Sequence, residues 1–210
     1  MISKNQIRCC LDLCSGLGGF SEAFVDGGWD VIRIDIDPKF KDIPFTVIGD
    51  VRDLDFVKKT VGNKKVDVIL ASPPCERFSL ACRTFPKEGI MEAMQVVGAC
   101  LEIVAMFHPK FWVLENPKAR LRWFLGSPKG TIRLSDYGAP YLKPTDYWGN
   151  INLPMLEKTV PPKIYLRPMK HDPKKPSPIY LSGKGIGKAQ RAKMPYGLSK
   201  AILEAVEASL

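Results

Sequence analysis

The feature that most constrains the fold of this chain is the alternation of short apolar runs with helix-like stretches over its first 136 residues. The apolar runs have the length of strands and lie at Cys9–Cys14, Trp29–Ile36, Phe45–Ile48, Val66–Ala71 and Phe111–Leu114. Strands that alternate with helices are built as a mostly parallel sheet with helices on both faces. We therefore predict an α/β fold.

The helix-like stretches lie between these runs and at the C-terminus. They are Phe20–Val25, Leu54–Val61, Glu88–Phe107 and Ser199–Leu210. By contrast, the interval from Pro140 to Pro178 contains nine of the 18 prolines, so we expect neither regular helix nor central strand there. An irregular stretch of that length is uncommon in a compact domain unless it is functional.

The net charge of +9 is concentrated in the C-terminal third of the chain. Residues 141–200 hold 12 Lys+Arg against 3 Asp+Glu, whereas residues 1–140 hold 19 against 17. A polyanion such as nucleic acid is the natural partner of such a segment, and a solvated basic surface without a specific partner is the alternative.

Other classes of protein are disfavoured by composition. The six cysteines form no CxxC pair, which argues against a zinc ribbon or a disulfide framework and for a reducing compartment. No apolar run of 18 residues and no apolar leader occur, so we expect neither a membrane span nor secretion.

A glycine-rich turn follows the first predicted strand, in the run from Leu11 to Phe20. Glycines let the backbone approach a ligand closely, and the following helix start offers free N–H groups. Asp35 lies 19 positions beyond Gly16 at the end of the next strand, where a carboxylate accepts ribose hydroxyls. The turn lacks both the Gly-Lys-Ser/Thr of phosphate loops and the spacing of dinucleotide sites, which favours an adenosyl cofactor; a plain tight turn is the alternative.

Two further strand ends carry reactive groups. Cys75 follows Pro73-Pro74 directly after the fourth strand, and Glu115 ends the fifth. Because the carboxyl ends of parallel strands meet at one edge, the thiol and the carboxyl are expected in one crevice. A nucleophilic thiol needs nearby positive charge, which Arg77 and Arg83 could supply. A buried apolar cysteine and a structural glutamate are the alternatives.

Five ordered motifs over about residues 8–140 resemble those of the DNA cytosine-5 methyltransferases. They are Asp12–Phe20, Ile34–Asp37, Gly49–Val51, Pro73–Cys75 with the following Phe78-Ser79, and Glu115–Pro117. The resemblance implies a Rossmann-like fold that uses S-adenosylmethionine. It also implies attack by Cys75 on C6 of a flipped cytosine in DNA, with Glu115 at N3.

The resemblance, together with the positive charge of the C-terminal segment, suggests three groups of site residues. The cofactor-binding residues are Asp12, Cys14, Ser15, Gly16, Gly18, Gly19, Phe20, Asp35, Ile36, Asp50, Val51 and Pro73. The catalytic residues are Cys75, Glu115, Asn116, Lys143 and Thr145. The nucleic-acid contacts are expected from Arg77, Ser79, Arg83, Arg167, Lys170, Lys174, Lys175, Lys184 and Lys188. No metal site is expected.

The chain departs from the family pattern in two places. Lys143 and Thr145 occupy the two arginine positions of the family's Gln-x-Arg-x-Arg motif, and a lysine cannot form a bidentate fork. The recognition region is reduced to residues 150–187, between a catalytic part at 1–149 and a returning helix at 188–210. A segment this short should grip phosphates and read few bases, so we predict relaxed specificity and steep salt dependence.

Three alternatives remain open at this point. They are a tRNA cytosine-5 methyltransferase, a catalytically impaired nucleic-acid-binding homologue, and an amino-methyltransferase, whose Ser-Pro-Pro signature fits Ser72-Pro73-Pro74 but not Cys75. The favoured interpretation is a monomeric cytoplasmic enzyme acting on double-stranded DNA, encoded by a prokaryote or a virus.

Overall fold

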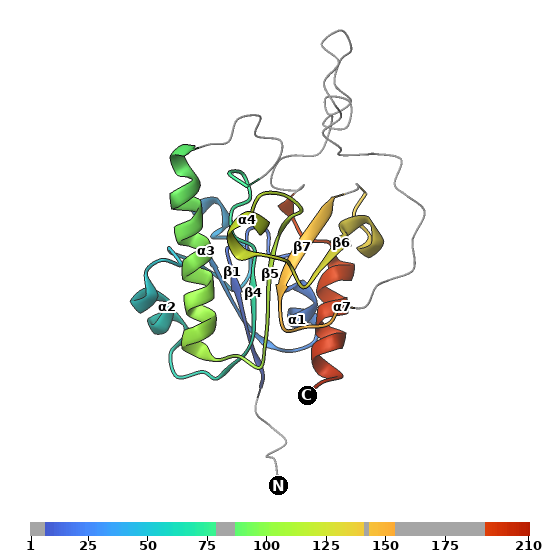
Figure 1. Cartoon of the computed structure of the whole chain (residues 1–210). Helices are drawn as coiled ribbons and strands as arrows, with labels where there is room; N and C mark the ends of the chain where they lie inside the picture. Colours follow the sequence, from blue (N-terminus) through green and yellow to red (C-terminus); the bar gives the residue numbers. More distant parts are fainter. Residues whose placement is uncertain (1–6, 79–86, 141–142, 154–191) are drawn as a thin grey trace.

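A seven-stranded sheet forms the centre of the computed structural model, which describes residues 7–78, 87–140, 143–153 and 192–210 (Figure 1). The strands lie in the order β3-β2-β1-β4-β5-β7-β6. Strands β1 to β5 pair in parallel, and β7 runs antiparallel to both β5 and β6. The predicted mostly parallel α/β fold is confirmed. The strands are β1 Cys9–Leu13, β2 Asp30–Asp35, β3 Thr46–Ile48, β4 Val66–Ala71, β5 Phe111–Pro117, β6 Gly130–Arg133 and β7 Pro144–Gly149.

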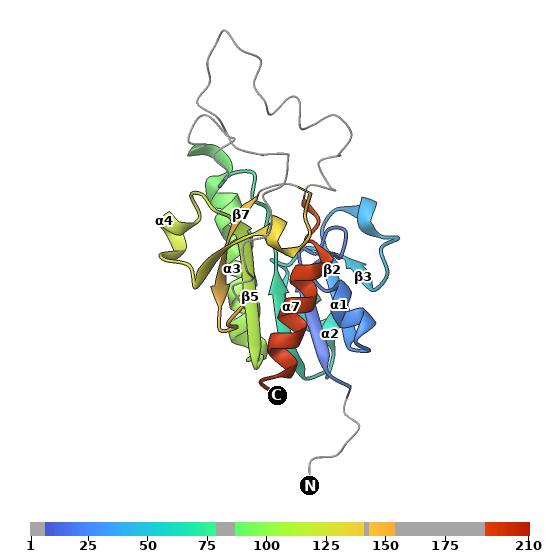
Figure 2. The same ribbon diagram turned by 90° about the vertical axis from the view of Figure 1, so that its right-hand side faces the viewer.

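Helices cover both faces because the strands are apolar on both faces. In β1, Leu11 and Leu13 join a cluster with residues of α2 and α3, whereas Cys10 joins a second cluster with residues of α1 and α7. Successive side chains of a strand point to opposite faces, so this division follows from the sequence. Figure 2 shows α7 beside α1, across the sheet from α3. The helices are α1 Glu22–Asp26, α2 Leu54–Val61, α3 Lys87–Phe107, α4 Arg122–Leu125 and α7 Tyr196–Glu207.

Helix α3 is the most apolar of the described helices. Its stretch Gly89–Phe107 has the length and composition of a membrane-crossing helix. In this fold Ile90, Val97 and Ile103 are buried in the cluster that lines one face of the sheet. The apolar composition of α3 is therefore used to cover the sheet, as expected of a core helix.

The region after Pro140 is more regular than we predicted. Residues Pro144–Gly149 form β7, which lies between β5 and β6, so the prediction that no central strand occurs there is wrong. The proline does not prevent this because it is the first residue of its strand, a position that tolerates a missing N–H. The sequence analysis also missed β6, a four-residue strand without a clear apolar period.

Candidate active site

The glycine-rich turn between β1 and α1 has a backbone that few other residues could adopt. Cys14, Gly16 and Gly18 have positive φ angles of 57°, 53° and 71°. The N–H of Gly16 donates to Oδ2 of Asp35 at 2.8 Å, and the N–H of Gly18 donates to the Ser15 carbonyl at 2.8 Å. The carboxylate at the end of β2 therefore lies directly against the turn, as the spacing in the sequence predicts.

Two polar atoms of this region lack hydrogen-bond partners within the part of the chain that the structure describes. They are the hydroxyl of Ser15 and Oδ1 of Asp12, both buried. Burying a polar group without a partner is costly, so such atoms are common where a ligand completes the site. Burial also raises the pKa of Asp12 to about 7, against the opposing effects of the Ser21 hydrogen bond and the Arg33 charge.

An ion pair lies just after the end of β3. The guanidinium of Arg52 binds Asp50 through Nε at 2.9 Å and Nη2 at 2.6 Å, which lowers the pKa of Asp50. The adjacent Val51 is buried, whereas Ile36, next to Asp35, exposes 58% of its surface. An exposed isoleucine beside the proposed ribose acid offers an apolar surface at the same edge of the sheet.

The reactive strand ends are neighbours, as predicted. Strands β4 and β5 pair in parallel, and the amide of Asn116 donates from Nδ2 to the Pro73 carbonyl at 3.0 Å. This buried bond ties the Pro-Pro-Cys turn to the end of β5. Cys75 is partly exposed, whereas Glu115 is buried and its Oε1 accepts no hydrogen bond from any described residue.

Lys143 brings a positive charge to this pair from the residue before β7. Its Nζ lies 3.8 Å from Oε1 of Glu115. Burial raises the pKa of Glu115, and the Lys143 ammonium opposes that rise. Burial likewise raises the pKa of the Cys75 thiol, with Lys143 lowering it and Glu115 raising it. The three groups thus form one electrostatic unit.

This arrangement corrects one expectation about the thiol. The charge that acts on Cys75 comes from Lys143, not from Arg77, which is exposed. The net effect on the thiol pKa is also a rise rather than a fall, because desolvation exceeds the attraction to the ammonium. Arg83 lies outside the described residues.

Strand β7 is anchored beside this crevice by a buried carboxylate. Asp146 is fully buried and binds the guanidinium of Arg122 on α4, with Nη2 at 2.6 Å from Oδ1. The Thr131 hydroxyl on β6 donates to the same oxygen at 2.7 Å. Thr145, one residue earlier, is buried, and its hydroxyl donates to the Lys143 carbonyl at 3.3 Å. The network fixes the strand whose start carries Lys143.

Most of the predicted nucleic-acid contacts lie outside the described residues. Of that group the structure places Arg77 alone, on the exposed turn after Cys75. The others stay predictions: Ser79, Arg83, Arg167, Lys170, Lys174, Lys175, Lys184 and Lys188.

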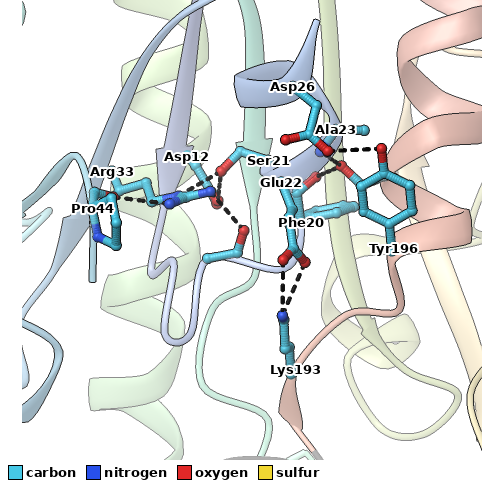
Figure 3. Close-up of polar contacts among 12 residues, drawn as sticks. Asp12, Phe20, Ser21, Glu22, Ala23, Asp26, Arg33, Pro44, Lys193 and Tyr196 are labelled. Carbon is cyan, nitrogen blue, oxygen red and sulfur yellow. Dashed lines mark hydrogen bonds and ion pairs between the residues drawn. The ribbon is translucent and has the colours of Figure 1, made fainter. Parts of the chain in front are cut away.

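The polar contacts that hold the glycine turn and α1 are not evident from the sequence (Figure 3). Ser199 of α7 donates its hydroxyl to the Phe20 carbonyl at 2.8 Å. Lys193 lies 2.9 Å from Glu22, and the Tyr196 hydroxyl donates to Asp26 at 2.8 Å. Arg33, inside the apolar run of β2, was the one available signal of a buried polar network, because an inward charge in a central strand needs partners.

Comparison with known proteins gives a family and a fold. Residues 9–122 match the family model described as C-5 cytosine-specific DNA methylase. The type II methyltransferase M1.HphI of Haemophilus parahaemolyticus is 30% identical over 135 residues, covering 55% of this chain and 35% of that protein. A frog virus 3 protein named "Probable DNA (cytosine-5)-methyltransferase" is 28% identical over 158 residues, covering 67% of this chain and 70% of that protein.

The structural relative agrees in fold. A crystal structure of a protein assigned as a prophage-encoded DNA modification methyltransferase from E. coli covers 74% of this chain and 52% of its own, with a TM-score of 0.52 and 21% identity. The chain thus spans about a third of the length of the Haemophilus relative.

Proposed function

The chain belongs to the C-5 cytosine-specific DNA methylase family, and from this premise we propose that it transfers a methyl group from S-adenosylmethionine to C5 of cytosine in DNA. One observation carries the proposal: the buried bond from Asn116 to the Pro73 carbonyl ties together the adjacent strand ends that carry the partly exposed Cys75 and the buried Glu115. An exocyclic amino-methyltransferase has no use for this thiol and carboxyl pair.

In the proposed mechanism the Cys75 thiolate adds to C6 of an extrahelical cytosine while Glu115 gives its proton to N3. The raised pKa of Glu115 supports its role as the acid. Oε1 of Glu115 and Oδ1 of Asn116 accept no hydrogen bond from the described residues and are acceptors suited to the amino edge of the base. Addition makes C5 nucleophilic. After methylation, a base takes the C5 proton, the thiolate departs from C6 and the N3 proton returns to Glu115, which restores the ring and the enzyme.

Family and fold imply S-adenosylmethionine as the cofactor, which supplies the electrophilic methyl group when bound. The residues at the carboxyl ends of β1, β2 and β3 fit this group. We assign the ribose to Asp35, the adenine to Ile36, Asp50 and Val51, and the amino acid part to the turn from Cys14 to Phe20. The buried, unpartnered hydroxyl of Ser15 supports that assignment. Asp12 is buried under the turn and would hold the turn in place.

We further propose that the substrate is double-stranded DNA, held by the basic segment at residues 150–187. The names of the relatives support DNA, and the charge of the segment supports phosphate contacts. On this proposal the enzyme acts as a monomer in the cytoplasm, without a metal.

The test is methyl transfer from tritiated S-adenosylmethionine to duplex DNA, single-stranded DNA and tRNA, with analysis of the product base. We expect 5-methylcytosine in DNA; methylation of tRNA alone, or of an exocyclic amine, would refute the proposal. Cys75→Ser should abolish both turnover and covalent trapping on DNA that contains 5-fluorocytosine. Cys9→Ser, which alters a buried thiol at the opposite end of β1, serves as the matched control and should retain both.

A further inference from the structure

A buried arginine that the proposed chemistry does not use lies beneath the glycine turn (Figure 3). Arg33 is 4% exposed, and its guanidinium makes three hydrogen bonds. Nε donates to the Ser21 hydroxyl at 2.8 Å, Nη1 to the Pro44 carbonyl at 2.9 Å, and Nη2 to the Gly18 carbonyl at 2.9 Å. One side chain thus joins the turn, the start of α1 and the segment before β3.

Strand β2 holds the glycine turn at two points. Asp35 accepts the Gly16 N–H at 2.8 Å, and Arg33, two residues earlier in the strand, donates to the Gly18 carbonyl at 2.9 Å. The guanidinium is packed against the turn so closely that a Cβ on Gly18 would lie 2.6 Å from Cζ of Arg33. The position of the turn is therefore set by β2 as well as by its own glycines.

The charge of the guanidinium is balanced within the same cluster. The Ser21 hydroxyl, which accepts from Arg33, donates to Oδ2 of Asp12 at 2.6 Å. Asp12 and Arg33 are directly paired residues of β1 and β2. Burial of an ion requires both a counter-charge and hydrogen bonds, and the planar fork of arginine satisfies three directions that a lysine ammonium on a flexible stem does not reproduce.

We propose that Arg33 is a positioning residue that holds the glycine turn in its cofactor-binding conformation, with Asp12 and Ser21 fixing the guanidinium. The identity of the cofactor rests on the function proposed above. Arg33 is enclosed, so it acts through the Gly18 carbonyl and does not touch the cofactor. Its removal should weaken cofactor binding without changing the chemistry of Cys75 and Glu115.

The binding test uses Arg33→Met, Arg33→Lys and calorimetric titration with S-adenosylhomocysteine. If Arg33→Met leaves the turn correctly formed for a tenth of the time, the affinity falls about tenfold. The KM for S-adenosylmethionine should rise by a similar factor, while kcat at saturation stays within about twofold of the original. Arg33→Lys should recover part of the affinity. Leu134→Ala, a fully buried core truncation distant in sequence, controls for lost stability.

The second measurement needs no cofactor. Hydrogen exchange of the ligand-free protein should become faster at the amides of residues 16–20 in Arg33→Met but not in Leu134→Ala. Unchanged exchange there, or an affinity loss no greater than that of Leu134→Ala, would overturn the proposal. If the unaltered protein bound no S-adenosylhomocysteine, the cofactor assignment would fail, and the exchange experiment would still decide whether Arg33 orders the turn.

Discussion

Replacement of Asp12 by Asn should change how the stability of the protein depends on pH. Asp12 is fully buried, and burial raises its pKa from the ordinary aspartate value of 3.8 to about 7. An asparagine has nearly the same shape and can still accept the hydrogen bond from the Ser21 hydroxyl, but it does not titrate. The difference between the two proteins therefore isolates the carboxyl.

The sign follows from proton binding. The folded state, with the higher pKa, holds the Asp12 proton more tightly than the unfolded state, so folding is favoured at low pH and this contribution is lost as the pH rises through about 7. With these two pKa values, the linkage relation gives a loss of about 3 kcal/mol between pH 5 and pH 8.

Urea unfolding at intervals from pH 5 to pH 8 would measure this loss. The free energy of unfolding of the original protein should fall, relative to Asp12→Asn, by about 3 kcal/mol over that range, with the steepest change below pH 7. Parallel curves for the two proteins would refute the reasoning, because they would mean that Asp12 has the same pKa in the folded and unfolded chains.

Three further outcomes are expected. Gly19→Ala places a Cβ 2.4 Å from the Met194 carbonyl and should lower the free energy of unfolding by about 1–3 kcal/mol. Gly98→Ala, whose Cβ meets nothing within 4 Å, should raise that free energy slightly. Equal effects of the two substitutions would contradict the close approach of Gly19 to Met194. Lys143→Met removes the charge that lowers the pKa of Cys75, so alkylation of Cys75 by iodoacetamide at pH 8 should slow. Lys143→Arg keeps the charge and should preserve the rate of alkylation. Equal rates in both variants would exclude this charge effect. Binding to duplex DNA should weaken about a thousandfold between 50 and 200 mM salt if six phosphates are contacted, and a flat response would argue against phosphate recognition by the basic segment.

The sequence predicted the site residues at the strand ends better than it predicted the buried residues that hold those strand ends in place. The positions of Asp35, Cys75 and Glu115 follow from one rule, that parallel strands present their carboxyl ends at one edge, and the pairing of β4 with β5 confirms the expected neighbours. The role of Arg33 does not follow from such a rule. Its three partners come from separate segments and become visible only when those segments are packed together.

Strand β7 was missed for a related reason. Its six residues include a proline, a threonine, an aspartate and a glycine, which indicates a loop when each residue is considered alone. Asp146 is nevertheless fully buried, because Arg122 and Thr131 from α4 and β6 satisfy its carboxylate. Local propensity is overridden here by contacts that are distant in sequence, and the period-2 pattern is hidden because a charged residue occupies an inward position.

The charges around Cys75 bear on the nucleophile and acid roles proposed for Cys75 and Glu115. Burial raises the pKa of both Cys75 and Glu115, so a state in which both are ionised is disfavoured. Lys143, with Nζ 3.8 Å from Oε1 of Glu115, favours one negative charge on the pair. In the proposed reaction the proton is on Glu115 and the negative charge on Cys75, and the Lys143 ammonium stabilises that charge. Arginine at position 143 would keep this charge balance, whereas a neutral residue would favour protonation of both groups and leave the thiol unreactive.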